Sequence, residues 1–176
     1  TAEKKQVQSK EKSAKGEAKK QSKASQPVPS KVEAHFLKSS GRPLLYKPSE
    51  QMPIIEVANF PSLGQLTALR FLEWVQENPD GVISLPTGKT PEYFIKWTRH
   101  YLENWTTKKV QDEISQIGLD PKNRPELKGL RFVQIDEFYP IDPAQHNSFH
   151  YYISRHYIKG FGLDPKTVRL GQPIKE

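Results

Sequence analysis

Two short stretches of the chain carry side chains that could do chemistry. The first, Val82–Pro91, passes from an apolar run into the small polar turn Thr87-Gly88-Lys89-Thr90. The second, Leu130–Tyr139, is another apolar run, and it ends on the adjacent carboxylates Asp136 and Glu137. If both runs are parallel strands of one sheet, the turn and the acid pair lie at the same sheet edge. Open α/β sheets bind ligands just outside that edge, so we interpret the two stretches as one site.

The polar turn has the composition of a phosphate cradle. It lies between a predicted strand end and a predicted helix start, where unpaired backbone N–H groups and the helix dipole favour an anion. Gly88 allows the backbone to approach a ligand closely, and Thr87, Lys89 and Thr90 add donors. The spacing of the nucleoside-triphosphate loop is absent. On composition alone, an ordinary strand-to-helix turn is an equally good interpretation.

Asp136 and Glu137 follow the second apolar run directly, and one of them could act as a general base. Burial and a neighbouring carboxylate would set the pKa of such a group. The alternative is a loop start followed by a helix-capping acid, and the residues alone do not choose between the two. His146, His150 and His156 match no metal-ligand spacing, so we expect no metal site, and we expect His156 to pack in the core.

The elements that must position these groups alternate between strand and helix. Apolar runs predict strands over 82–85 and 130–135 and a further strand from Val168. Helical spacing predicts helices over 62–78, 91–105 and 108–117, and another that begins at Asn147 or Ser148 and ends at Lys159-Gly160. This order predicts an α/β domain of three layers with a mostly parallel sheet.

Local signals indicate where these elements begin and end. Ser62 and Gln65 fit a capping box, and Thr90 is the expected N-cap of the helix that Pro91 starts. A short strand is predicted over Ile54–Val57, and Gly118 is expected to end a helix. Four aromatic residues of the second helix share one face and are expected to form core rather than a stacking platform: Phe94, Trp97, Tyr101 and Trp105.

The net charge of +7 comes almost entirely from the first 31 residues. They carry nine Lys and three Glu, whereas the remainder carries 18 basic and 17 acidic residues. Because residues 1–31 are Lys-rich and lack aromatic side chains, we expect a disordered tail there and a folded domain over 32–176. A nearly neutral domain argues against nucleic-acid binding.

The composition also limits the chemistry and the compartment. The chain has no cysteine, which excludes disulfides and thiolate catalysis. No apolar run approaches the roughly 20 residues that cross a bilayer, and the amino end lacks a hydrophobic signal core. We therefore expect a soluble, cytoplasmic protein with no membrane partner.

At the two opening stretches the sequence resembles the glucosamine-6-phosphate deaminase (isomerase) family. Leu85-Pro86-Thr87-Gly88-Lys89-Thr90-Pro91 is similar to that family's Leu-Pro-Thr-Gly-Gly-Thr-Pro loop, and Ile135-Asp136-Glu137-Phe138 to its Met-Asp-Glu-Tyr motif. The segment His146–Tyr152 resembles the helix start that follows in the family. The resemblance extends over about residues 57–170.

The resemblance implies a cofactor-free enzyme, classed with hydrolases and isomerases of amino sugar metabolism. It would convert glucosamine 6-phosphate and water to fructose 6-phosphate and ammonia. Residues 87–90 would hold the sugar phosphate, and Asp136, with Glu137 beside it, would move a proton between C2 and C1. Lys89 replaces a family Gly and Phe138 a family Tyr.

The family's later motifs, which open the sugar ring and complete the phosphate site, have no counterpart before Glu176. We therefore expect the amino-terminal part of such a domain, without full activity by itself. Two other functions stay open: a 6-phosphogluconolactonase-like hydrolase and a non-catalytic sugar-phosphate-binding regulatory domain. A homo-oligomer also stays open.

Overall fold

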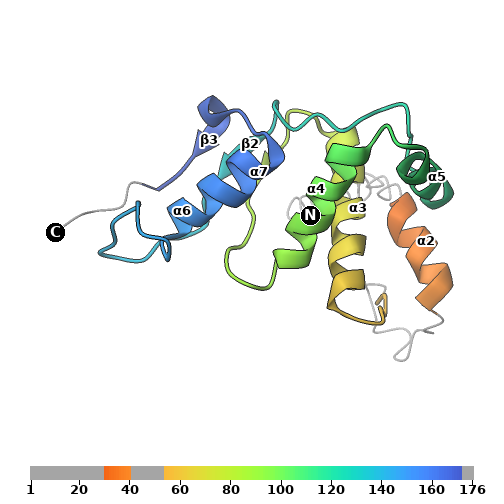
Figure 1. Cartoon of the computed structure of the whole chain (residues 1–176), viewed down its shortest axis with the longest axis horizontal. Coiled ribbons are helices and arrows are strands. Elements are labelled where there is room, and N and C mark those ends of the chain that lie inside the picture. Colours follow the sequence, from red (N-terminus) through yellow and green to blue (C-terminus); the bar gives the residue numbers. More distant parts are fainter. Residues whose placement is uncertain (1–29, 41–53, 172–176) are drawn as a thin grey trace, which may run out of the picture.

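The computed structural model of the chain describes residues 30–40 and 54–171, which form helices packed against a small sheet (Figure 1). The disordered tail predicted for residues 1–31 lies outside the described residues, apart from Ser30 and Lys31. In chain order the elements are α2 Lys31–Ser40, α3 Phe60–Glu77, β1 Val82–Ile83, α4 Glu92–Asn104, α5 Lys108–Ile117, β2 Arg131–Val133, α6 Phe149–Ile153, the π-helical turn η1 Ser154–Ile158, α7 Lys159–Phe161, the 3₁₀ turn η2 Pro165–Thr167 and β3 Val168–Arg169.

The three strands form a parallel sheet in the order β1-β2-β3. Ile83 pairs with Phe132, and Phe132 pairs with Val168. The predicted α/β fold with a parallel sheet is therefore confirmed, although the strands are shorter than the apolar runs suggested. Because the strands are parallel, the loops that follow β1 and β2 leave the sheet at the same edge.

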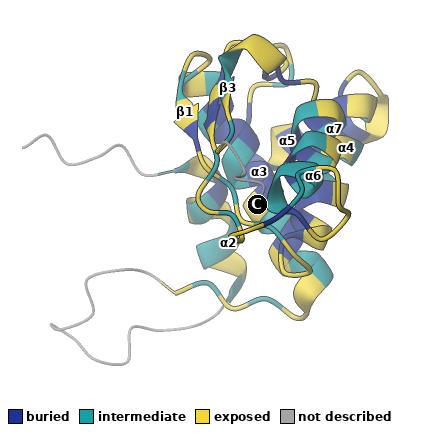
Figure 2. Cartoon of the chain, turned by 90° about the vertical axis from the view of Figure 1, so that its left-hand side faces the viewer, coloured by how far each residue is buried: buried dark blue, intermediate teal, exposed yellow. Residues whose placement is uncertain are grey.

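Burial alternates along the short strands, so the two faces of the sheet differ. Ile83 and Phe132 are buried and pack against the helices, whereas Val82 and Val133 are 58% and 42% exposed. The buried residues, dark blue in Figure 2, come from both the sheet and the helices and form one hydrophobic cluster. Of the four aromatic residues predicted for the core, Phe94, Tyr101 and Trp105 are buried and Trp97 is partly buried, which confirms that prediction.

Helix α3 begins two residues earlier than the sequence indicated, and the predicted capping box is wrong. Asn59 is the N-cap, and its side chain accepts a hydrogen bond from the backbone N–H of Ser62. Gln65 turns inward instead and donates to the Tyr101 hydroxyl and to Glu113. Asn59 fits the general preference for a cap, but Ser62 matched a more specific pattern.

The helices that follow β1 agree more closely with the sequence. Helix α5 spans Lys108–Ile117 as predicted, and Gly118 ends it in the left-handed region at φ 99°. Helix α4 begins at Glu92, after Pro91, so the predicted N-cap at Thr90 is wrong by one residue. Pro91 makes no side-chain cap, and a turn bond from the Glu92 N–H to the Lys89 carbonyl closes the loop instead.

Two further predictions are corrected in the amino-terminal part. Residues Ile54–Val57 form no strand, and α2 was not foreseen. The N-terminus of α2 is held by the buried carboxylate of Glu73 on α3, which accepts from the backbone N–H groups of Lys31 at 2.6 Å and Val32 at 3.3 Å. Glu73 lies about 40 residues further along the chain, so no local sequence pattern predicts that α2 begins at Lys31.

The segment 148–162 is one continuous helical stretch that contains the π-helical turn. Ser148 is the N-cap, as predicted, and its side chain accepts from the Tyr151 N–H. The stretch ends at Gly162, in the left-handed region at φ 72°, two residues after the predicted end at Gly160. The turn η1 changes which side chains of this stretch share a face, and the relative positions of Tyr152 and Tyr157 depend on it.

Candidate functional site

The loop after β1 has the unpaired donors that an anion needs. Within the described part of the chain, the backbone N–H groups of Thr87, Gly88, Lys89 and Thr90 donate no hydrogen bond. The hydroxyls of Thr87 and Thr90 and the ammonium of Lys89 likewise make no hydrogen bond or salt bridge with a described residue, although the charge of Lys89 acts on Glu92. Exposed amides in succession, next to a helix start, form a concave donor surface suited to phosphate.

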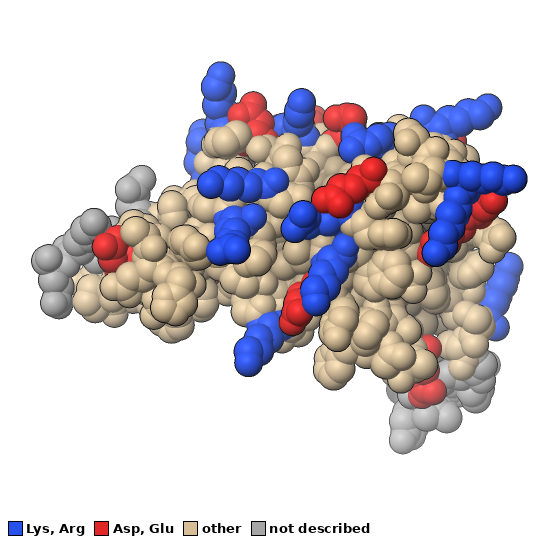
Figure 3. Space-filling view, viewed as in Figure 1, with Lys and Arg blue, Asp and Glu red and all other residues tan. Residues whose placement is uncertain are grey.

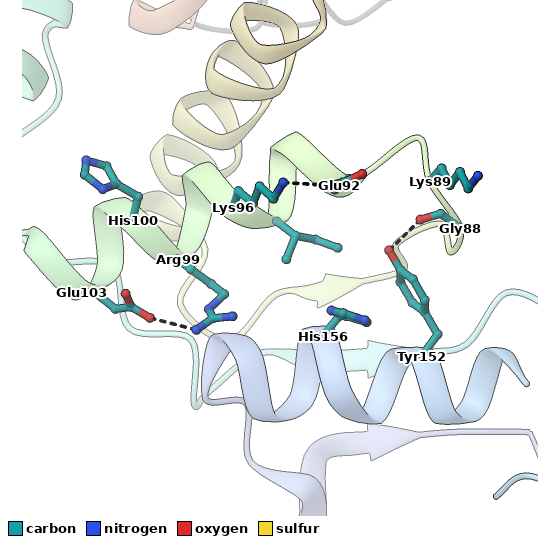
Figure 4. A pocket seen from close by; sticks show the side chains of 10 residues that line it. Gly88, Lys89, Glu92, Lys96, Arg99, His100, Glu103, Tyr152 and His156 are labelled. Atoms are coloured by element: carbon teal, nitrogen blue, oxygen red, sulfur yellow. Dashed lines mark hydrogen bonds and ion pairs between the residues drawn. The ribbon is translucent and has the colours of Figure 1, made fainter. Parts of the chain in front are cut away.

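Gly88 is required at the turn of this loop by its backbone conformation. Its φ of 93° lies in the region that L side chains rarely adopt, and an added Cβ would meet no atom within 4 Å. The requirement is therefore conformational and not a matter of space. The side chain of the neighbouring Lys89 extends away from Tyr152 and from the helices (Figure 4).

Asp136 lies at the same sheet edge as the loop. Ile83 and Phe132 are aligned in the sheet, and Thr87 and Asp136 each come four residues later. The Ser84 hydroxyl donates to the Val133 carbonyl at 2.6 Å, which holds the two strand ends together. Asp136 is exposed, and its carboxylate has no partner among the described residues. The structure thus places both predicted stretches at one edge.

Glu137 is engaged very differently from its neighbour. Its carboxylate accepts from the Ser148 hydroxyl at 2.8 Å and from the backbone N–H groups of Phe149 at 3.0 Å and His150 at 2.8 Å. Burial alone would raise the pKa of Glu137, but these hydrogen bonds and one from the Phe138 N–H outweigh it and lower the pKa. Glu137 therefore caps the first turn of α6, and whether it also touches substrate stays a prediction.

Two tyrosines of the helical stretch 148–162, Tyr152 and Tyr157, reach the loop from the other side. The Tyr152 hydroxyl donates to the Gly88 carbonyl at 2.8 Å, and the Tyr157 hydroxyl donates to the Pro86 carbonyl at 2.5 Å. Burial raises the pKa of both tyrosines, most strongly that of Tyr157. Helical periodicity contains no signal for a contact with a loop about 65 residues earlier, so the sequence did not identify these two residues.

A cavity of about 530 Å³ lies between α4 and the α6–η1 segment, below the loop (Figure 4). Its cations are largely paired, because Lys96 bonds Glu92 at 2.7 Å and Arg99 bonds Glu103 at 3.3 Å. His156 lines it and packs against the Tyr152 ring, with centroids 4.5 Å apart. Burial, together with Arg155 and Arg99, lowers the pKa of His156.

The charged surface around the site is mixed in sign. Figure 3 shows acidic side chains interspersed among the basic ones on the face that α4 and α6 share. Within residues 30–40 and 54–171, no three His, Asp or Glu side chains converge as a metal site would require. In the same residues, no helix is both long and apolar enough to cross a bilayer.

Sequence comparison places the chain close to one group of enzymes. It is 30% identical over 105 residues to the glucosamine-6-phosphate deaminase of Geobacillus sp. (strain WCH70), which covers 60% of this chain and 35% of that protein. It is 28% identical over 106 residues to the glucosamine-6-phosphate deaminase of Bacillus velezensis, covering 60% and 36%. The chain therefore spans about a third of the length of these curated relatives. No protein-family model matches it.

Comparison with solved structures also finds a glucosamine-6-phosphate deaminase. A solved structure of a monomeric glucosamine-6-phosphate deaminase, described as a missing link of the NagB superfamily, matches with a TM-score of 0.53 and 19% identity. The match covers 67% of this chain and 42% of that one. The resemblance inferred from the two motifs is thus confirmed by relatives of that name, and the fold is that of the deaminase over the matched part.

Proposed function

We propose that this chain carries the sugar-phosphate loop and the catalytic base of a glucosamine-6-phosphate deaminase. The observation that carries the proposal is the shared sheet edge, where four N–H groups at 87–90 and the carboxylate of Asp136 lie together without a hydrogen-bond partner among the described residues. Similarity to proteins named glucosamine-6-phosphate deaminase supplies the substrate.

The loop would hold the anionic end of the substrate. The N–H groups of residues 87–90 and the Lys89 ammonium can surround phosphate oxygens, and charge-assisted hydrogen bonds of this kind are about twice as strong as neutral ones. Thr87 and Thr90 would add hydroxyl donors to phosphate or sugar. An uncharged sugar hydroxyl cannot form such charge-assisted hydrogen bonds, so this loop would bind the phosphate end of the substrate in preference to the sugar.

Asp136 would move the proton. In the open-chain amino sugar, the hydrogen on C2 is acidic because the C1 aldehyde stabilises the resulting carbanion as an enolate. Asp136 takes this proton and returns it to C1, while the amine nitrogen loses a proton to water and the C1 oxygen gains one from water, which leaves a hydroxymethyl group at C1 and an imine at C2. Water then hydrolyses the imine, giving fructose 6-phosphate and ammonia. The Asp136 carboxylate is exposed and accepts no hydrogen bond from any described residue, so it can bind and release the proton. Glu137 would act by fixing the segment that carries Asp136, since its own oxygens are occupied by α6.

The deaminase is favoured over the two alternatives for separate reasons. The deaminase is favoured over the lactonase because the two curated relatives and the solved structure described above carry the deaminase name. A binding domain without catalysis would need the loop but not the carboxylate, so Asp136 is the residue that separates an enzyme from a sensor.

The test uses Asp136→Asn and an assay that does not depend on ring opening of the amino sugar. The chain is incubated with fructose 6-phosphate and ammonium in D₂O, and NMR follows deuterium entry at C1. We expect exchange with the wild-type chain and a loss of about 100-fold or more in the variant, with the dissociation constant for fructose 6-phosphate within about 3-fold of wild type. Full exchange by the Asn variant, or none by the wild type, would refute the catalytic assignment.

A further inference from the structure

We propose that Tyr152 and Tyr157 are positioning residues, which fix the 86–90 loop so that its N–H groups point to the anion. The inference rests on the proposed function of that loop, and it adds residues that no motif identified. Both hydroxyls donate to loop carbonyls, at 2.8 Å to Gly88 and 2.5 Å to Pro86. Tyr152 reaches the loop from the helical stretch beneath it (Figure 4), and Tyr157 follows in η1 of the same stretch.

Because the peptide bonds are trans, a hydrogen bond that fixes a carbonyl also fixes the direction of the N–H of the following residue. In a trans peptide the C=O and the following N–H point in opposite directions, and the peptide bonds of this loop are trans. With the Pro86 carbonyl held by Tyr157, the Thr87 N–H points away from the helix. With the Gly88 carbonyl held by Tyr152, the Lys89 N–H does the same. These are two of the four N–H groups that lack a partner among the described residues.

The π-helical turn is what lets one helix make both contacts. In an α-helix of 3.6 residues per turn, side chains five apart lie about 140° apart around the axis. The i→i+5 bonds of a π turn bring such residues toward one face, and η1 begins between Tyr152 and Tyr157. Their rings lie 6.0 Å apart, and both reach the same loop. Without the extra residue, one of the two hydroxyls would face elsewhere.

The tyrosine hydroxyls suit this purpose because they remain donors. Burial raises the pKa of Tyr157, and burial together with the charge of Glu92 raises that of Tyr152, so both stay protonated at neutral pH. The Tyr157 ring is fully buried and packs on Phe132 of β2, with ring centroids 5.8 Å apart. The loop after β1 is therefore fixed relative to the strand that leads to Asp136.

The experiment compares Tyr152→Phe, Tyr157→Phe and the double variant with Tyr101→Phe in the full chain. Tyr101 is a matched control, since its buried hydroxyl also donates, to Glu113 at 2.6 Å, but it does not touch the loop. The probe is inorganic phosphate, titrated by calorimetry, and NMR follows the amide signals and hydrogen exchange of Thr87 and Lys89. We expect each loop-facing variant to weaken phosphate binding about 3- to 10-fold, the range for losing one hydrogen bond, and the double variant to weaken it further. Tyr101→Phe should leave the affinity unchanged.

The outcomes separate this inference from the proposed function. Wild-type phosphate affinity and unshifted Thr87 and Lys89 amides in the double variant would overturn the positioning role. A folded wild-type chain that binds phosphate, responds to the tyrosine variants and yet exchanges no C1 proton would support the positioning role and overturn the catalytic proposal.

Discussion

Asp136 and Glu137 are adjacent in sequence, yet the fold gives them different chemistry. The Glu137 carboxylate accepts hydrogen bonds from α6, while the Asp136 carboxylate is exposed and has no partner in the described residues. A carboxylate occupied by backbone donors is held in its charged form and is a poor base. Of the two interpretations that the residues left open, the helix-capping acid therefore applies to Glu137, and the general base stays our proposal for Asp136.

Adding a single methyl group at Gly88 tests whether the backbone conformation of the 87–90 loop is needed for phosphate binding. Gly88→Ala should lower the free energy of unfolding by about 1–2 kcal/mol, because its φ of 93° strains any L residue. The strained loop should also bind phosphate about 10-fold more weakly or worse. Urea unfolding measures the first effect, and calorimetric titration with phosphate measures the second.

Gly162 provides the matched control for Gly88. It too has a positive φ, of 72°, with no atom within 4 Å of an added Cβ, but it ends α7 and lies outside the loop. Gly162→Ala should cost similar stability and leave phosphate affinity at the wild-type value. Equal affinities for the two variants would show that the conformation of Gly88 is not needed for binding.

At the scale of elements, the starts of two helices, α2 and α6, are held by carboxylates from other elements. Glu73 on α3 holds the start of α2, and Glu137 after β2 holds the start of α6. In the second case the cap has a further consequence. The helix that Glu137 orients carries Tyr152 and Tyr157, so the acid after β2 and the loop after β1 are connected through one helix.

The cap at Glu137 predicts a pH dependence of stability. Its pKa is lowered from 4.5 in the folded state, so its stabilising contribution is complete above that unfolded value and is lost as the pH falls through the folded pKa. The difference in free energy of unfolding between wild type and Glu137→Gln should therefore be largest near neutral pH and shrink below about pH 4.5. Urea unfolding from pH 7 to pH 3 measures it.

Glu126→Gln is the control for this dependence, because Glu126 is exposed, caps no helix and has one ion pair, to Arg124 at 3.3 Å. Its curve should run close to that of the wild type at every pH. A constant difference between wild type and Glu137→Gln across the range would mean that Glu137 is not charged preferentially in the folded state.

At the scale of the molecule, the described helices cover one face of the parallel sheet, and the other face is largely exposed. Phe132 is fully buried against Tyr157, whereas its strand neighbour Val133 is 42% exposed. Because the strand side chains alternate, adjacent residues of β2 experience opposite environments. Stability in this chain should therefore depend strongly on one face of the sheet and weakly on the other.

Paired substitutions in β2 test this asymmetry. Phe132→Ala should lower the free energy of unfolding by about 3–5 kcal/mol, since it removes a large buried ring and leaves a cavity. Val133→Thr should change it by no more than about 0.5 kcal/mol, as is usual for exposed positions. Urea unfolding of the two variants provides the measurement, and similar losses in both would contradict the assignment of the faces.

Much of this arrangement follows from short-range patterns in the sequence. The apolar runs before Pro86 and Asp136 predicted parallel strands. Helical spacing, together with Gly118, predicted both the first and the last residue of α5. The same patterns were enough to place the polar turn and the acid pair at one sheet edge. Such patterns succeed because strand alternation, helix periodicity and glycine conformation are local properties of the backbone.

The contacts that only the tertiary structure decided join residues far apart in the chain. The start of α2 depends on Glu73, the first turn of α6 depends on Glu137, and the loop depends on Tyr152 and Tyr157. Local periodicity assigns such side chains to a face but does not specify which polar atom they meet. The sequence by itself therefore determined the sheet edge and the candidate site residues, whereas packing decided which carboxylate is unpaired and which hydroxyls hold the loop, because those hydrogen bonds form only after distant elements have been brought together.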